Sequence, residues 1–238
     1  MSPPKVLAVI PTYNERENIE ALLEEICRLP VENLEAVIVD DRSPDGTEEI
    51  VRKLMARNPR LSLIERKGPA GRGLAGRDGF LYALQSGADF VVEMDGDFSH
   101  QPKHIPELLK AMAGCDMVIG SRLIAGGSDL DRPGWRRWLT HAANFYSRTL
   151  LGFPIADANS GFRCYSRYAL QQIHPETLRS KGPSIVHETL FRALRAKLKV
   201  IEVPIEFVDR KKGKSKLNLS RLLAGYFWIL RLKFAGKG

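Results

Sequence analysis

Two acidic residues separated by a single glycine are the part of this sequence best suited to chemistry. Asp95 and Asp97 flank Gly96 directly after an apolar run, so two carboxylates stand two positions apart where the chain turns. Carboxylate oxygens are hard ligands that suit Mg²⁺ or Mn²⁺, and such an ion can bridge the phosphates of a bound diphosphate. The structural alternative is an acidic turn that caps the next helix. The triplet alone does not decide between these two interpretations.

Polar residues recur at three other places where a predicted strand ends. Residues 12–15 (Thr-Tyr-Asn-Glu), the pair Asp40 and Asp41, and the pair Ser121 and Arg122 each follow an apolar run. In a parallel sheet the carboxyl ends of the strands share one edge, and ligands bind beyond that edge. The recurrence over four strands therefore favours a ligand site. The carboxylates after the second strand are also well placed to accept hydrogen bonds from a base or a ribose.

The elements that must position these residues alternate between strand and helix through the first half of the chain. Short apolar runs predict strands at residues 6–10, 36–39, 61–64, 90–94 and 117–119, and helical spacing predicts helices at residues 18–29, 46–57 and 73–86. Repeated βα units predict an α/β fold with a mainly parallel central sheet flanked by helices.

The second half of the chain is less regular. We expect a helix that ends at residue 150, a strand at residues 200–207, a basic loop at 210–216 and an apolar segment with basic residues at both ends at 217–234. Neither an internal repeat nor a low-complexity linker divides the sequence, so one continuous domain is the simplest prediction.

The composition indicates which class of partner the protein binds and in which cellular compartment it works. The 238 residues carry a net charge of +8, which favours an anionic partner such as nucleic acid, an anionic lipid or a phosphorylated substrate. Three scattered cysteines without paired spacing predict free thiols in a reducing compartment. No apolar stretch reaches the roughly 20 residues of a spanning helix, and the first residues lack the apolar run of a signal peptide. We therefore expect a cytoplasmic protein.

Two other functions fit the sequence less well. A nucleic-acid-binding module needs basic and aromatic residues along one face, whereas the acidic strand ends would repel a phosphate backbone. We expect no nucleic-acid partner. Residues 71–76 match the Gly-x-Gly-x-x-Gly fingerprint of dinucleotide-binding proteins. That fingerprint belongs in the first βα turn, and two βα units precede it here, so a dehydrogenase is not predicted.

Six motifs together resemble the family 2 glycosyltransferases and, within them, the dolichol-phosphate and polyprenol-phosphate mannose synthases. They are V-I-P-T-Y-N-E at 9–15, V-D-D-R-S-P-D-G-T at 39–47, M-D-G-D-F-S-H-Q-P at 94–102, I-G-S-R at 119–122, N-S-G-F-R at 159–163 and F-V-D-R-K-K-G-K-S-K-L at 207–217. The resemblance implies a GT-A fold, a nucleotide-sugar donor and transfer with inversion at the anomeric carbon.

The resemblance also implies roles for individual residues. The residues expected to bind the nucleotide sugar are Pro11, Tyr13, Glu15, Asp40, Asp41 and Asp95, with Lys216 a further candidate. Asp95 and Asp97 would hold Mg²⁺ or Mn²⁺. The residues expected at the acceptor phosphate are Arg122, Arg136 and Thr140, and the catalytic set is Asp95, Asp97, Arg122, Arg136, Glu188 and Arg210. A phosphate monoester is already anionic at neutral pH, so the main task is to stabilise the departing diphosphate.

Three positions depart from the family pattern. Gly96 stands where alanine is usual, and Ser99 stands where some relatives have glutamine. The metal would then have few protein ligands beyond the carboxylates of Asp95 and Asp97. The third departure is Ile-Val-His-Glu at 185–188 in place of aromatic-Gln-x-Glu, which retains Glu188 in altered surroundings.

The reaction that the resemblance implies is transfer of a hexose, mannose from GDP-mannose, to the phosphate of a dolichyl-type polyprenyl phosphate. The alternative is UDP-glucose or another sugar nucleotide, with this or another acceptor. We expect a catalytic domain at residues 1–217, with a nucleotide half at 1–122 and an acceptor half at 123–217, and an amphipathic helix at 218–238. That helix either lies in the membrane interface or packs on the domain or a partner. Peripheral attachment to the cytoplasmic face of a membrane, directly or through a membrane subunit, is expected.

Overall fold

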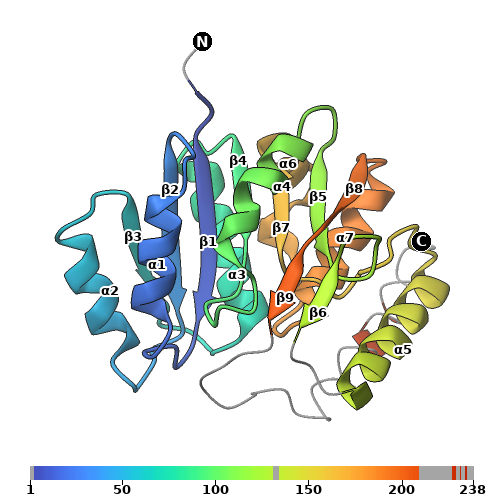
Figure 1. The fold of residues 1–238 in the computed structure, drawn as a ribbon, viewed down its shortest axis with the longest axis horizontal. Helices are drawn as coiled ribbons and strands as arrows, with labels where there is room; N and C mark the ends of the chain where they lie inside the picture. The colour runs from blue at the N-terminus through green and yellow to red at the C-terminus, as the bar shows by residue number, and fades with distance from the viewer. Residues whose placement is uncertain (1–2, 131–133, 209–226, 229–230, 232–233, 235–238) are drawn as a thin grey trace.

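A central sheet lies between two layers of helices in the computed structural model, which describes residues 3–130, 134–208, 227–228, 231 and 234 (Figure 1). The strands of this sheet are β1 (Val6–Thr12), β2 (Leu34–Asp40), β3 (Leu61–Glu65), β4 (Phe90–Glu93), β5 (Met117–Ser121), β7 (Arg163–Ser166) and β8 (Val200–Pro204). Their order is β3-β2-β1-β4-β7-β5-β8. In the described sheet β7 is antiparallel to β4 and β5, and the other neighbouring pairs are parallel. The predicted mainly parallel α/β fold is confirmed.

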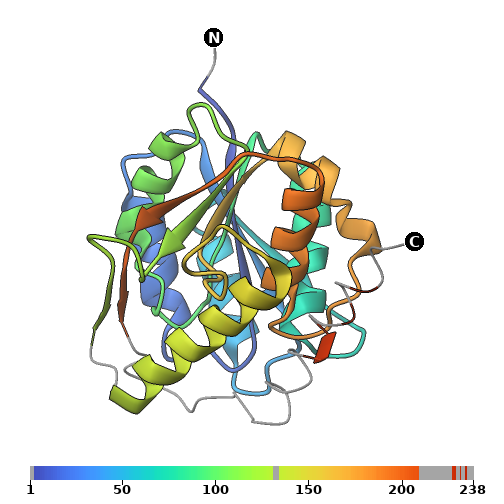
Figure 2. The ribbon, with the colours of Figure 1, turned by 90° about the vertical axis from the view of Figure 1, so that its right-hand side faces the viewer.

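Helices cover both faces of the sheet (Figures 1 and 2). One face carries α1 (Ile19–Arg28), α2 (Thr47–Met55) and α4 (Ile105–Ala111), and the other carries α3 (Arg72–Gln85), α6 (Arg167–Ile173) and α7 (Ile185–Arg195). Two short 3₁₀ helices are η1 (Pro102–His104) and η2 (Pro175–Thr177). The long helix α5 (Gly134–Leu151) lies at the β8 side of the sheet, nearest the viewer in Figure 2. Among the described residues, no helix is both long and apolar enough to cross a membrane.

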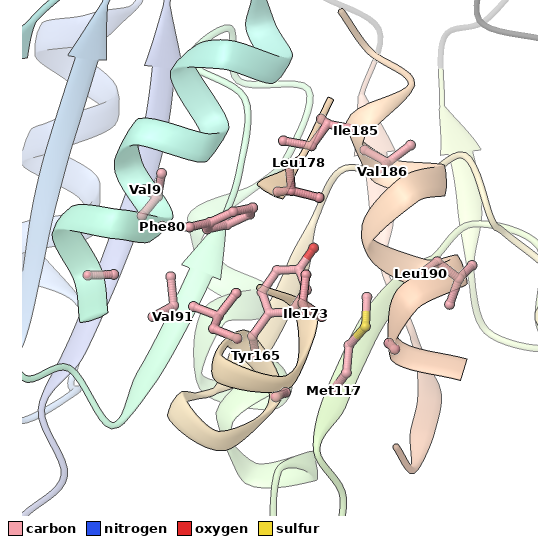
Figure 3. Packing of buried hydrophobic residues seen from close by; sticks show 14 of the residues in the cluster. Val9, Phe80, Val91, Met117, Tyr165, Ile173, Leu178, Ile185, Val186 and Leu190 are labelled. Carbon is pink, nitrogen blue, oxygen red and sulfur yellow. The ribbon is translucent and has the colours of Figure 1, made fainter. Parts of the chain in front are cut away.

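Alternating side chains along β1 divide the apolar core into two layers. Val9 packs in the layer that contains Phe80 of α3, whereas Ile10 packs in the layer that contains Leu22 of α1. In the first layer the rings of Phe80 and Tyr165 meet edge to face, with centroids 5.3 Å apart (Figure 3). Successive strand residues point to opposite faces, so an unbroken apolar run is the pattern of a strand covered on both sides.

The strands and helices predicted for the first half of the chain are confirmed, with ends that differ by at most two residues. The single strand predicted at residues 200–207 is wrong. β8 ends at Pro204, and β9 (Glu206–Val208) pairs instead with β6 (Ser128–Leu130) in a separate two-stranded sheet. Pro204 has no N–H to donate, and the next residue, Ile205, is 1% exposed and donates its N–H to the Ser121 carbonyl at 3.0 Å. The Ile205 carbonyl accepts the Ser128 N–H at 3.0 Å, so the chain passes from β5 to the partner strand β6 at this residue.

Two strands, β6 and β7, were not predicted, and β7 lies inside the main sheet. β7 contains Arg163, which is fully buried, and Ser166, so it lacks the apolar run that marks its neighbours β4 and β5. Its place between β4 and β5 depends on pairing with strands that lie more than 40 residues away in sequence. Most of the helix predicted at residues 218–238 lies outside the described residues.

The carboxyl ends of the parallel strands meet at one edge of the sheet. Thr12, Asp40 and Ser121 end β1, β2 and β5 there, and Glu93 ends β4. Because β7 is antiparallel, it begins at this same edge, where Arg163 is in register with Glu93. The loops after β1, β2, β4 and β5 and the loop before β7 therefore surround one place.

Candidate active site

The acidic triplet follows β4 directly, and its two carboxylates differ in exposure. Asp97 is 3% exposed, and its Oδ1 accepts the Ser99 N–H at 3.0 Å and the Ser99 hydroxyl. The Asp95 side chain is 35% exposed. Gly96 packs closely on β1, since a Cβ at this position would lie 3.1 Å from Thr12 Cγ2. The glycine lets the turn lie against the end of β1, and Ser99 orients Asp97.

An arginine that the sequence analysis did not select lies within this acidic cluster. Arg72, the first residue of α3, donates from Nη1 to Glu93 Oε1 at 2.7 Å and from Nε and Nη2 to Asp95 Oδ1 at 3.1 and 3.0 Å. Burial opposes the charge on Arg72, but the carboxylates of Asp95 and Glu93 outweigh it and raise the pKa of Arg72 above its usual value. The available signal in the sequence was Glu93, a charged residue inside an apolar strand.

His100 also contacts the triplet. It is 2% exposed, its Nδ1 accepts the Asp95 N–H at 3.0 Å, and its ring stacks on Phe162 with centroids 5.1 Å apart. Burial lowers the pKa of His100 in spite of the neighbouring carboxylates of Asp95 and Asp97. The ring is therefore neutral at neutral pH, which suits its role as an acceptor for the backbone of the triplet.

The donor atoms of the triplet suit a divalent cation that is shared with a substrate. Glu93 and Asp95 form ion pairs with the guanidinium of Arg72, and the carboxylates of Asp95 and Asp97 both lie close enough to His100 to act on its pKa. Among the described residues, no group of three or more His, Cys, Asp or Glu side chains is arranged to enclose a metal ion. Mg²⁺ in nucleotide sites is bound by one or two carboxylates with substrate phosphates and water completing the shell. Asp95 and Asp97 fit that kind of site.

The nucleotide residues predicted after β2 shape the neighbouring loops. Asp40 is fully buried and accepts the Thr12 hydroxyl at 2.8 Å, and both the N–H and the hydroxyl of Ser43, at 2.7 and 2.6 Å. Asp41 is 7% exposed, accepts the Gly71 N–H at 2.7 Å and forms an ion pair with Arg66. The two carboxylates thus join the ends of β1 and β2 to the start of α3.

The residues predicted after β1 lie at the same edge of the sheet. Pro11 is buried at the end of β1, and Tyr13 is 42% exposed. Glu15 accepts a hydrogen bond from Asn18 Nδ2 at 3.1 Å, and its N–H donates to the Thr47 hydroxyl at 3.0 Å. An exposed aromatic ring beside buried carboxylates is a suitable surface for a base to stack on.

Arg122 lies on the other side of β4, after β5, and the structure binds it to an acid that the sequence analysis did not select. Its Nε and Nη2 donate to the two oxygens of Asp157 at 2.6 and 2.8 Å. The guanidinium also lies over the Phe207 ring, 4.9 Å from the centroid. Asp157 is fully buried and accepts a further bond from Asn144 of α5 at 3.2 Å. Arg122 therefore joins β5 to the loop before β7 and to α5.

The other predicted acceptor residues belong to α5 and the basic loop. Thr140 lies in α5, and its carbonyl accepts a bond from Asn144 Nδ2 at 3.2 Å. Arg136 is in the first half of the same helix, and its side chain lies outside the described part of the structure. Arg210 and Lys216 are also outside the described residues. The structure thus brings α5 to the site edge without placing these three cations.

Glu188, predicted to be catalytic, is fully buried near the start of α7. Its oxygens accept the N–H groups of Arg179, at 3.1 Å, and Ser180, at 2.8 Å, and the guanidinium of Arg192 at 2.7 Å. Glu188 therefore joins α7 to the chain just before it, and this segment packs on the start of α3.

That packing explains the glycines at residues 71–76. A Cβ at Gly71 would lie 2.3 Å from the Lys181 carbonyl oxygen, and one at Gly73 would lie 2.2 Å from the Ser180 carbonyl oxygen. The Gly73 N–H donates to the Lys181 carbonyl at 3.1 Å. Gly71 and Gly73 therefore permit close backbone contact between two loops. In dinucleotide-binding proteins the glycines of this motif instead let the backbone approach a bound pyrophosphate.

A second buried arginine organises the loop before β7. Arg163 donates to the carbonyls of Ser160 and Ala158, at 2.7 and 2.9 Å, and to the Thr189 hydroxyl at 3.1 Å. His187 is in contact with the same loop through Asn159, 2.9 Å from its Nε2, and burial together with Arg163 lowers the pKa of His187 to about 3. A neutral His187 therefore stands at the altered position of the 185–188 segment.

Comparison with protein families and curated proteins agrees with this geometry. The model of Glycosyl transferase family 2 matches residues 7–174. The chain is 38% identical over 214 residues to the undecaprenyl-phosphate mannosyltransferase of Micrococcus luteus, which covers 90% of this chain and 88% of that protein. It is also 38% identical over 236 residues to the polyprenol monophosphomannose synthase of Mycolicibacterium smegmatis, which covers 98% of this chain and 88% of that protein.

Solved structures show the same fold. Glucosyl-3-phosphoglycerate synthase from Mycobacterium tuberculosis, crystallised with Mn²⁺, uridine diphosphate and glucosyl-3-phosphoglycerate, aligns with a TM-score of 0.68 at 19% identity. The alignment covers 95% of this chain and 77% of that one. At this identity the likeness concerns the fold, and it confirms the predicted GT-A architecture.

Proposed function

Because this chain belongs to glycosyl transferase family 2, we propose that it transfers mannose from GDP-mannose to the phosphate of a polyprenyl phosphate. One observation carries the proposal: Asp95 and Asp97 lie at the carboxyl edge of β4, beside the loops of β1 and β2 that would receive a nucleotide. The names of the two relatives, both of which are 38% identical, support mannose as the sugar and a polyprenyl phosphate as the acceptor.

In the proposed reaction a phosphate oxygen of the lipid attacks the anomeric carbon of the donor as the bond from that carbon to the diphosphate breaks. The configuration inverts, the bonding electrons leave with GDP, and no proton has to be removed from a phosphate that is already ionised. A divalent cation, when bound at Asp95 and Asp97, neutralises charge on the diphosphate. We assign Pro11, Tyr13, Glu15, Asp40 and Asp41 to the nucleoside, since they gather at the ends of β1 and β2.

The acceptor half supplies cations in this proposal. Arg136, Arg210 and Lys216 are assigned to the phosphate and diphosphate groups, with Thr140 beside the acceptor phosphate. Arginine suits forked contacts to phosphate oxygens, and positioning two polyanions supplies much of the catalysis. We assign Arg122 and Glu188 to positioning, because Arg122 is bound to Asp157 and Glu188 holds the segment packed on α3.

We also propose that the protein attaches peripherally to the membrane that holds its lipid substrate. Trp138 and Phe145 are each 71% exposed and stand seven positions apart on α5, which places them on one side of the helix. Arg148 is exposed on the same helix. Exposed aromatic rings beside an arginine are typical of surfaces that lie in the interface of an anionic bilayer. A membrane subunit is the competing means of recruitment.

The experiment that tests the reaction is transfer from labelled GDP-mannose, GDP-glucose and UDP-glucose to polyprenyl phosphate, with Mn²⁺, Mg²⁺ or chelator. We expect mannosyl transfer that requires a divalent cation and is lost in Asp97→Ala but kept in Glu176→Ala, an exposed acid of η2. Transfer of glucose alone would refute the mannose assignment. Transfer unaffected by chelator or by Asp97→Ala would refute the metal assignment.

A further inference from the structure

Glu93, Arg72 and Asp95 form a chain of alternating charges that ends at the expected metal ligand. Arg72 contacts Glu93 Oε1 at 2.7 Å, and two of its nitrogens contact Asp95 Oδ1 at 3.0 and 3.1 Å. Glu93 is fully buried and its Oε2 accepts the Tyr165 hydroxyl at 3.0 Å. The acid behind Arg72 is therefore held in place by the core of the domain.

The guanidinium is also confined by the backbone on either side of it. The glycines that flank Arg72 lie against the carbonyls of Lys181 and Ser180, which fixes the start of α3. Near the other end of the side chain, a Cβ at Gly161 would lie 2.7 Å from Arg72 Nη2. The chain thus leaves little room for Arg72 to move away from Asp95.

We propose that Arg72 is a resident cation of the metal site, which lowers the affinity of Asp95 and Asp97 for a free divalent cation so that the ion binds together with the diphosphate of the donor. The inference rests on the metal ligands assigned in the proposed function. A fixed positive charge in direct contact with a ligand carboxylate repels an incoming dication. The diphosphate brings both negative charge and oxygen ligands, so its arrival offsets that repulsion and couples the two binding events.

The test is the binding of Mn²⁺ to the full-length protein, measured from the electron paramagnetic resonance signal of free Mn²⁺, with and without GDP. We expect wild type to bind Mn²⁺ weakly alone and much more tightly with GDP. Arg72→Met should bind Mn²⁺ alone about tenfold more tightly than wild type, because one positive charge is removed beside the ligands. Arg72→Lys keeps the charge and should behave like wild type. Arg28→Met, which removes an exposed arginine of α1, is the matched control.

Glu93→Gln tests the effect of charge on Mn²⁺ binding in a protein that keeps Arg72, and a double variant tests whether the two charges offset each other. Glu93→Gln removes one negative charge while Arg72 stays, so Mn²⁺ should bind more weakly than to wild type. The double variant Arg72→Met with Glu93→Gln restores the net charge of the cluster and should bind Mn²⁺ with nearly wild-type affinity.

Mn²⁺ affinity that is unchanged or weaker in Arg72→Met, or unchanged in Glu93→Gln, would overturn the inference. Failure of wild type to bind Mn²⁺ with or without GDP would overturn both the inference and the proposed metal site. If the Mn²⁺ effects are found and mannose is not transferred, the proposed reaction fails while the role of Arg72 stands.

Discussion

Asp157 binds the guanidinium of Arg122 through two parallel hydrogen bonds, 2.6 and 2.8 Å long, at the carboxyl end of β5. Asp157 is fully buried and the Arg122 side chain is 7% exposed, so both charges are largely removed from water. The Arg122 N–H donates to the same carboxylate at 3.1 Å. A buried pair of this kind fixes local geometry, and each partner depends on the other.

We expect Asp157→Asn to lower the free energy of unfolding by about 3–5 kcal/mol, because it leaves a buried guanidinium without its counter-charge. Urea unfolding followed by circular dichroism measures this. Glu24→Gln is the control, since it removes an exposed ion pair with Arg28 and should cost at most about 1 kcal/mol. Equal effects of the two substitutions would contradict the assignment of a structural pair.

The same pair predicts a dependence of stability on pH. Burial raises the pKa of Asp157, but the ion pair and hydrogen bonds from Arg122 outweigh this and hold that pKa below its usual value. In the unfolded chain the pKa of Asp is about 3.9. Because the folded-state pKa of Asp157 lies below that value, the ionised carboxylate stabilises the folded protein at any pH above the unfolded pKa. This stabilisation is lost as the pH falls through the folded-state pKa. The stability difference between wild type and Asp157→Asn should therefore be constant near neutral pH and shrink below about pH 4. If the difference in unfolding free energy between wild type and Asp157→Asn instead grows as the pH falls, the lowered pKa of Asp157 is contradicted.

Gly73→Ala is expected to destabilise the start of α3. Its Cβ would lie 2.2 Å from the Ser180 carbonyl oxygen and 2.7 Å from that of Gly182, and backbone atoms must move to admit it. We expect a loss of about 1–3 kcal/mol, the usual cost of overpacking. Gly68→Ala, where nothing lies within 4 Å of the added carbon, is the control in the same thermal unfolding series. Wild-type stability in both variants would show that the backbone of residues 180–182 can move to admit the added carbon without a measurable loss of stability.

Ser99→Ala should weaken metal binding without removing a proposed ligand. The hydroxyl and the N–H of Ser99 both donate to Asp97 Oδ1, and alanine keeps only the N–H bond. Loss of a partner that orients a metal ligand costs about 10–100-fold in affinity. Titration of Mn²⁺ in the presence of GDP measures the change. Ser86→Ala, which removes a hydroxyl bond at the end of α3, is the control and should leave Mn²⁺ affinity unchanged.

Trp138→Ala and Phe145→Ala should each reduce flotation with anionic liposomes. Burial of one large apolar side chain contributes roughly 1.5–3 kcal/mol, so each variant should lose about tenfold or more in partition coefficient. Tyr168→Ala is the control, because Tyr168 is 55% exposed on α6, which lies near the amino ends of the parallel strands, whereas α5 lies toward their carboxyl ends (Figure 1). No flotation of wild type would favour recruitment by a membrane subunit.

Local patterns in the sequence were enough to predict the parallel strands in the first half of the chain and the residues that follow them. The apolar run at 90–94 predicted β4, and with it the position of Asp95 and Asp97 at the carboxyl edge. This works because alternation and apolar runs record how each strand faces the core, and chain direction then decides which end carries the loop residues.

The tertiary structure alone decided the partners of the buried charges. Arg72 contacts Glu93 and Asp95 across 21 and 23 positions, and Arg122 contacts Asp157 across 35. β7 enters between β4 and β5 in the antiparallel direction, which brings Arg163 to the site edge. No local period encodes such contacts, because a buried charge is stabilised by whichever opposite charge or carbonyl the fold brings to it. The sequence by itself thus determined where the acidic triplet lies, and the fold decided that an arginine shares it.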